Sequence, residues 1–296
     1  MRAGGVASIT RSGSRHDDAM TPVENSFTGV GGTKIVYDTY LPEGPPRGLV
    51  LVAHGVAEHA GRYGHVAERL VALGLEVVIP DHRGHGRSGG KRLLVRDFSE
   101  FTTDLETLRA LVAVDGRSTY LLGHSMGGEI ALDYALDHQP DLAALILSGP
   151  AVLPGDDISP LLMRVAKVMG KLVPGLPGQT LGSSSISRDP AVVRAYDEDP
   201  LVFRGALKAG IGGAMLRTME TFPSRLPSLH LPLLVLAGSE DKLVKPEGAE
   251  LVARLAGSAD KTLKIYPGLY HEVFNEPEKD VVLGDLTDWL KAHLES

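Results

Sequence analysis

A five-residue segment, Gly123-His124-Ser125-Met126-Gly127, constrains this chain more than any other feature. It fits the G-x-S-x-G pattern of a nucleophile elbow, in which a sharp turn between a strand and a helix exposes a serine hydroxyl. The context fits too, because an apolar strand-like run over 119–122 precedes it and a helix-like run over 128–136 follows. Glycine on both sides suits a turn too tight for side chains. We therefore expect Ser125 at the carboxyl end of a strand, facing a helix N-terminus; an ordinary glycine-rich turn is the alternative.

The composition bounds the class of protein. The 296 residues are 43% hydrophobic and 23% charged, which indicates a folded chain with a large core. A formal net charge of −7 argues against nucleic acid as a partner, because phosphate binding needs a basic surface. The absence of cysteine excludes disulfides, thiolate metal sites and a cysteine nucleophile.

The sequence also bears on location. No apolar run approaches the roughly 20 residues that a membrane span requires, and the N-terminal segment lacks the apolar region of a signal peptide. We therefore expect a cytoplasmic protein or one peripherally associated with a membrane.

Short apolar segments alternate with helix-like segments from residue 34 onward. Strands are predicted over 34–40, 48–53, 76–79, 119–122, 144–147, 233–236 and 263–266. Helices are predicted over 66–73, 98–114, 246–255 and 278–294, besides the one after Ser125. Strands rich in Val, Ile and Leu between helices are typical of a mostly parallel sheet covered on both faces. The segment 34–40 is expected at an edge of that sheet.

The alternation stops between residues 151 and 226. This stretch is rich in proline, and one helical face within it is apolar. That face contains Leu161, Val165, Val168, Met169 and Leu172. We expect a helical cap over 151–226, an α/β core over 25–150 and 227–296, and a disordered tail over 1–24. A late insertion of this kind would lie over the carboxyl ends of the strands, where ligands bind.

A nucleophilic serine needs a general base, and the base needs an acid that fixes its tautomer. When the serine lies on such an elbow, the acid and then the histidine follow it on loops after late strands. Of the 11 histidines, only His271 falls in the loop after the last predicted strand. Asp241 follows the preceding strand, with Glu240 beside it as a competing candidate. The sequence therefore predicts a catalytic triad of Ser125, Asp241 and His271.

Acyl transfer also needs N–H donors for the oxyanion of the tetrahedral intermediate. One donor is expected from Met126, directly after the nucleophile, and the second from the loop after an early strand. That loop begins His54-Gly55, so the Val56 N–H is the expected second donor.

Together these motifs resemble the monoacylglycerol lipases of the α/β-hydrolase superfamily, and the bacterial members most. The resemblance rests on His54-Gly55-x-x-Glu58-His59, Gly61-Arg62-Tyr63, the run 81–88 (DHRGHGRS), the elbow followed by Gly128, and the Asp241/His271 pair. It implies an α/β-hydrolase fold and a serine esterase that cleaves monoacylglycerol into fatty acid and glycerol. The acyl-enzyme would form on Ser125, and neither metal nor organic cofactor would be required.

The resemblance also implies that the cap is a lid that holds the acyl chain. The residues expected to contact substrate are Leu161, Val165 and Met169 of the cap, and Glu58 and Arg62 for the glycerol head group. Transient contact between a membrane or lipid interface and the apolar face of the cap is expected as well; the alternative is that this face packs on the sheet.

Two positions depart from the family pattern. Ala57 stands where many relatives carry glycine, and Phe274 stands where mammalian relatives carry a second histidine. Activity on lysophospholipids or small esters therefore remains an alternative. An alternative of another class is a non-catalytic lipid or hormone receptor on the same fold.

Overall fold

The computed structural model describes residues 20–154, 160–180 and 182–294. Within them, eight strands form one sheet in the order β1-β2-β4-β3-β5-β6-β7-β8. The strands are β1 (Val23–Thr28), β2 (Lys34–Tyr40), β3 (Gly48–Ala53), β4 (Leu75–Pro80), β5 (Thr119–His124), β6 (Ala144–Ser148), β7 (Leu233–Gly238) and β8 (Lys261–Tyr266). Strands β3 to β8 pair in parallel, whereas β2 is antiparallel to both its neighbours.

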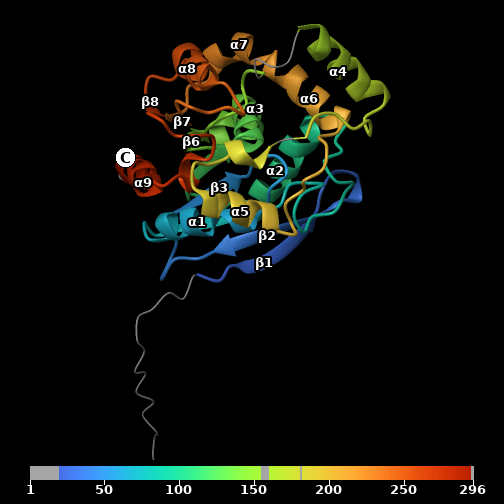
Figure 1. The fold of residues 1–296 in the computed structure, drawn as a ribbon. Coiled ribbons are helices and arrows are strands. Elements are labelled where there is room, and N and C mark those ends of the chain that lie inside the picture. The colour runs from blue at the N-terminus through green and yellow to red at the C-terminus, as the bar shows by residue number, and fades with distance from the viewer. Residues whose placement is uncertain (1–19, 155–159, 181, 295–296) are drawn as a thin grey trace, which may run out of the picture.

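Helices cover both faces of this sheet (Figure 1). The core helices are α1 (Gly64–Val71), α2 (Ser99–Val112), α3 (Met126–His138), α8 (Pro246–Leu255) and α9 (Lys279–Leu294). Alternate strand residues point to opposite faces, so Leu121 packs with the residues of α2, α3 and α8 while Leu122 packs with those of α1 and α9. The predicted α/β-hydrolase fold is confirmed: a mostly parallel sheet lies between two layers of helices.

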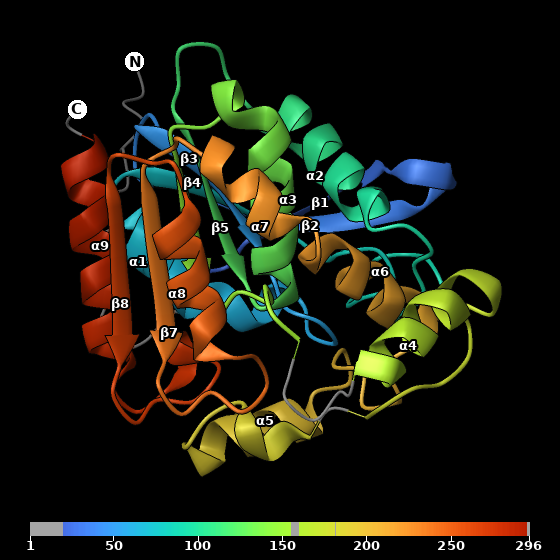
Figure 2. The same ribbon diagram turned by 90° about the horizontal axis from the view of Figure 1, so that it is seen from above.

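The segment between β6 and β7 contains helices and no strand within its described residues. Its helices are α4 (Pro160–Leu172), α5 (Pro190–Glu198), α6 (Ala209–Met219) and α7 (Phe222–Arg225). Short 3₁₀ turns are η1 (Val30–Gly32), η2 (Ala60–Tyr63), η3 (Gln139–Asp141), η4 (Ser183–Ser185), η5 (Leu226–Ser228) and η6 (Val273–Asn275). Figure 2 shows α5 beyond the carboxyl ends of the strands, with α4 and α6 side by side next to it.

Two expectations about the N-terminal region are wrong. Val23 and Glu24, placed in the tail from the sequence, belong to β1, and β1 rather than the segment 34–40 forms that edge of the sheet. The sequence of β1, VENSFT, is largely polar because only one of its sides pairs and its residues are exposed or half-buried. It therefore lacks the apolar alternation from which the other strands were predicted. The predicted tail residues 1–19 lie outside the described part of the chain.

Candidate active site

The turn that carries Ser125 joins β5 directly to α3. Ser125 has a φ of 55°, a left-handed conformation that is unfavourable for a residue with a side chain. A Cβ atom at Gly123 would lie 2.2 Å from the Gly127 carbonyl oxygen, and one at Gly127 would lie 2.0 Å from the Ala53 oxygen. Both glycines are therefore needed because α3 begins so close to β5 and β3. Because these glycines have no side chains, the chain can form the strained turn at Ser125.

Asp241 and His271 meet at the carboxyl end of the sheet, on the loops after β7 and β8. The His271 Nδ1 lies 2.6 Å from the Asp241 Oδ2, and both side chains are buried. The other oxygen of Asp241 accepts the backbone N–H groups of Leu243 and Val244, at 2.8 and 3.0 Å. The competing candidate, Glu240, is exposed to solvent. The structure thus brings Asp241, and not Glu240, to the predicted histidine.

Charge in the surroundings tunes this pair. Burial by itself favours neutral His271 and lowers its pKa, but the Asp241 carboxylate reverses the direction, so the pKa of His271 lies above its ordinary value. Glu272 and Glu58 add to the rise. Burial raises the pKa of Asp241, yet His271 and the two backbone donors bring it below the usual value. His271 is therefore a strengthened base held by an ionised acid.

A second histidine lies against the first without competing for its proton. The ring centroids of His124 and His271 are 4.7 Å apart. Burial, helped by His271, lowers the pKa of His124 to about 3, so its ring is neutral. A neutral neighbour leaves His271 free to take up a proton without charge repulsion from this side.

The two expected oxyanion donors belong to segments next to Ser125. Met126 is the first residue of α3, where a backbone N–H has no acceptor within the helix. Val56 follows Gly55, at which a Cβ atom would lie 3.2 Å from the Ser125 Cβ. No acceptor is found for the Val56 N–H in the described part of the chain. The loop that carries Val56 thus approaches the turn that carries Ser125 and Met126, and the assignment of these two N–H groups as oxyanion donors stays a prediction.

These groups open into one cavity of about 420 Å³, lined mainly by apolar side chains. Ser125, His271 and Val56 line it from the core, and Val165 and Met169 line it from α4. The cavity thus reaches from Ser125 to α4. Leu161, also expected here, has a side chain outside the described part of the structure.

One expected substrate contact is indirect. Glu58 lines the cavity, but Arg62 does not: its guanidinium lies 2.5 Å from Glu58 and 2.6 and 2.7 Å from the two oxygens of Glu272. Its other neighbour is the ring of Tyr196, 4.8 Å away. The guanidinium therefore serves to hold two carboxylates. Sequence reasoning missed Glu272, although it adjoins His271, and Tyr196, for which the cap sequence gives no signal.

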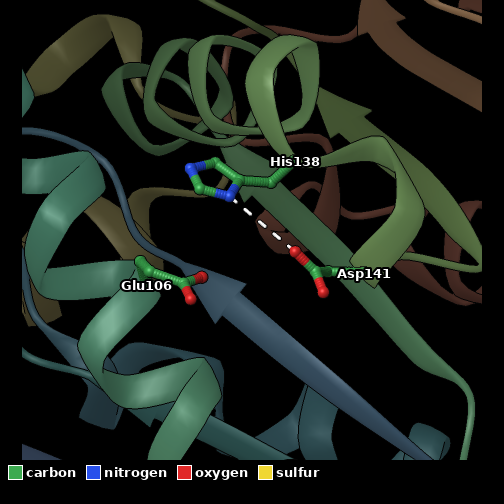
Figure 3. Close-up of side chains that lie close together, drawn as sticks. All are labelled: Glu106, His138 and Asp141. Atoms are coloured by element: carbon green, nitrogen blue, oxygen red, sulfur yellow. Dashed lines mark ion pairs between the residues drawn. The ribbon is translucent and has the colours of Figure 1, made fainter.

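A possible cation site lies elsewhere, at the end of α3 (Figure 3). Ligand atoms of Glu106, His138 and Asp141 all lie within 4.8 Å of one another. However, both oxygens of Glu106 accept N–H groups of Arg109, which also lies 3.5 Å from Asp141. Tyr134 donates to Glu106 as well. A guanidinium already supplies the positive charge, so we assign this group to an ion-pair network that joins α2 to α3.

Comparison with known proteins agrees with this geometry. The family model described as serine aminopeptidase, S33 matches residues 44–278. A monoacylglycerol lipase of Mycolicibacterium smegmatis is 51% identical over 93% of this chain and 99% of that protein. The chain belongs to the monoacylglycerol lipase family of α/β-hydrolases. Human monoglyceride lipase is 39% identical over 85% of the chain and 84% of its own length.

Solved structures place the fold in the same family. The monoacylglycerol lipase of Paleococcus ferrophilus superimposes with a TM-score of 0.80 at 29% identity, over 93% of this chain and all of that one. The family and fold expected from the sequence are therefore confirmed, and the chain is a carboxylic ester hydrolase. Among the described residues, no helix has the length and apolar character needed to cross a bilayer.

Proposed function

We propose that this chain hydrolyses the single ester of a monoacylglycerol to a fatty acid and glycerol, through an acyl-enzyme on Ser125. The observation that carries the proposal is the His271–Asp241 pair at 2.6 Å, whose histidine lines the same cavity as a serine on a strained elbow. A largely apolar cavity that ends at these groups suits one acyl chain with its ester at the serine. Relatives named monoacylglycerol lipase support the substrate class.

The reaction follows from the geometry. Because the Nδ1 of His271 engages Asp241, its Nε2 is the atom that takes the proton from the Ser125 hydroxyl. The serine oxygen attacks the ester carbonyl, and the resulting oxyanion accepts the N–H groups of Val56 and Met126. Collapse breaks the ester bond, and His271 returns its proton to the departing glycerol. Water then hydrolyses the acyl-enzyme by the same proton transfers.

We assign residues 151–226 the role of cap. In this role Val165 and Met169, with Leu161, contact the acyl chain, which agrees with the position of the first two in the cavity wall. Glu58 contacts the glycerol hydroxyls, and Arg62 fixes that carboxylate from behind at 2.5 Å. Arg62 thus acts on the head group through Glu58.

The cap also provides a surface for reversible contact with a lipid layer. Val168 and Leu172 of α4 are 55% and 72% exposed, so the alternative that this face packs on the sheet does not hold for them. The sequence of α4 has no acidic residue, and Arg164 and Lys171 are exposed beside the apolar pair. An exposed basic and apolar helix suits the interface of anionic lipids. The contact would be peripheral.

The test of the activity is fatty-acid release from matched monoacyl-, diacyl- and triacylglycerols, lysophosphatidylcholine and p-nitrophenyl esters. Ser125→Ala should lose at least about 10³-fold in kcat/KM, whereas Ser224→Ala, on the exposed helix α7, should match wild type. Preference for small soluble esters would overturn the lipid substrate. Failure of a serine-reactive phosphonate to label Ser125 would favour the receptor alternative.

Membrane contact is tested by flotation with vesicles that contain anionic lipid. Val168→Asp and Leu172→Asp should each reduce the bound fraction. Val281→Asp changes an equally exposed valine on α9, at the opposite end of the molecule (Figure 2), and should not. Equal flotation of all three variants and wild type would exclude docking through α4.

A further inference from the structure

Acidic and basic side chains line different sides of the catalytic cavity. Among the described residues that line it, the carboxylates are Glu58 and Glu272, both beside the catalytic loops. The guanidinium that holds them, Arg62, is outside the lining. The lining cation is Lys208, which adjoins Pro177 through a backbone bridge on the α4 and α6 side. A substrate head group near Ser125 therefore meets the acidic side of this cluster.

The cluster carries a net negative charge. Two carboxylates share one guanidinium, and the neighbouring His124 is neutral because burial lowers its pKa to about 3. Burial opposes ionisation of Glu58, yet the Arg62 guanidinium and the Tyr63 hydroxyl help to bring its pKa down to about 2, so this carboxylate is ionised. Both acidic side chains are at most 5% exposed, so water screens the excess charge weakly.

The two carboxylates have different duties. Glu58 accepts the N–H of Gly55 at 2.6 Å and the hydroxyl of Tyr63 at 2.7 Å, which ties it to the loop of the oxyanion hole. Glu272 accepts from the Arg62 guanidinium and, at 2.8 Å, from the Asn275 side chain; among the described residues its carboxylate accepts no hydrogen bond from that loop. Glu272 supplies the charge beyond the one that Arg62 neutralises.

We propose that Glu272 makes this end of the cavity select against anionic head groups, and so is a specificity residue for the leaving alcohol. A neutral glycerol meets no electrostatic repulsion beside the cluster, and its hydroxyls can donate hydrogen bonds to the carboxylate oxygens. A phosphate monoester on the same glycerol would place a second negative charge in a weakly screened cavity, which is costly. The inference rests on the proposed function, and it restricts the substrates to monoacylglycerols over lysophosphatidate.

The experiment compares two substrates that differ by one phosphate: 1-oleoylglycerol and 1-oleoylglycerol 3-phosphate, in the same neutral detergent. Wild type should strongly prefer the first. Glu272→Gln keeps the size of the side chain and one acceptor for Arg62, and should shift the ratio of kcat/KM values toward the phosphate ester by roughly tenfold. Glu250→Gln removes an exposed carboxylate of α8 outside the cavity and should leave the ratio unchanged.

A second measurement needs no variant. Lowering the pH from about 8 to about 6 should increase wild-type turnover of the phosphate ester relative to the neutral ester, because the phosphate monoester takes up a proton near pH 6 and loses one of its two negative charges. If Glu272→Gln does not fold, this measurement decides. An unchanged ratio in folded Glu272→Gln, or a pH-independent ratio in wild type, overturns the inference. Wild type inactive on 1-oleoylglycerol would instead refute the proposed function.

Discussion

The two sides of the cap are attached to the core in different ways. On the α5 side the contacts are polar and go to the catalytic loops: Asp199 lies 2.8 Å from His59, and the Phe203 N–H donates to the Ala57 carbonyl at 2.9 Å. The N–H of Glu272 donates to Ile186 at 2.8 Å. The α5 side thus holds the loops that carry Val56 and His271.

On the α4 side, α4 crosses α6 closely, and α6 in turn contacts α3 of the core. A Cβ atom at Gly170 would lie 2.5 Å from the Ala209 carbonyl, and one at Gly213 would lie 2.7 Å from the Ala166 carbonyl. Lys167 adds an ion pair to Glu220. This side contacts α6 and presents apolar residues both to the cavity and to solvent.

This difference between the two sides shows which parts of the site need a defined geometry. Reacting groups must be held within fractions of an ångström, which directional hydrogen bonds and ion pairs do well. An acyl chain needs only a continuous apolar wall, which packing without directional bonds supplies. The changes below test whether chemistry depends on the α5 side and chain binding on the α4 side.

The largest expected effect concerns Arg62, which contacts Tyr196 of α5. Arg62→Ala leaves Glu58 and Glu272 buried without their cation, which should lower the free energy of unfolding by about 3–5 kcal/mol. Leu172→Ala changes a 72% exposed residue on α4 and should alter it by at most about 0.5 kcal/mol. Urea unfolding of both variants measures the contrast. A loss below about 1 kcal/mol in Arg62→Ala would show that the cluster is not structural.

The next effect is on the α4 side. In Gly170→Ala the added methyl meets the Ala209 carbonyl and should displace α4, at a cost of about 1–3 kcal/mol. Activity on long-chain monoacylglycerol should fall several-fold while p-nitrophenyl acetate hydrolysis stays near wild type. Gly284→Ala, on α9 with open space around it, should instead stabilise the fold by about 0.5–1 kcal/mol. Equal loss on both substrates would contradict the division between the two sides.

A smaller effect concerns pH. Because the pKa of His271 is raised, the acid limb of kcat/KM should have its midpoint above about 6.5. Glu272→Gln removes one cause of the rise, so the midpoint should move to lower pH. Met169→Ala, on the α4 side, should leave the midpoint in place. Coinciding pH profiles of wild type and Glu272→Gln would show that Glu272 does not raise the pKa of His271.

The smallest effect concerns Ala57, which accepts the Phe203 N–H from the α5 side. Its φ of 69° is a left-handed conformation that favours glycine. Ala57→Gly should stabilise the fold by about 0.5–1 kcal/mol, because relief of the left-handed strain exceeds the added entropy of the unfolded chain. Ala253→Gly, in the last turn of α8, should instead destabilise the fold. Thermal unfolding distinguishes the two signs.

The sequence predicted what depends on local pattern. Apolar strands such as β5 and the elbow at Ser125 follow from residues that are adjacent in the chain. The positions of Asp241 and His271 followed from the order of strands, because the carboxyl ends of parallel strands meet at one edge. The edge strand β1 was missed because exposed polar residues conceal its period.

Contacts between distant segments could not be predicted in this way. Tyr196 of the cap lies over Arg62, and Asp199 meets His59, across about half the chain. No local period records such pairs, because they arise only when the cap folds back over the loops. The sequence therefore predicts that Arg62 contacts the substrate, whereas in the structure its guanidinium pairs with two carboxylates.

Val165 belongs to two surfaces at once, since it lines the cavity and is 47% exposed on α4. For an α4 helix seated in a lipid layer, an acyl chain can slide sideways from the layer into the cavity without crossing bulk water. The concentration that governs turnover is then the mole fraction of ester among its neighbouring lipids. Diluting the ester with inert lipid slows such an enzyme even when the total amount of ester in the tube is constant.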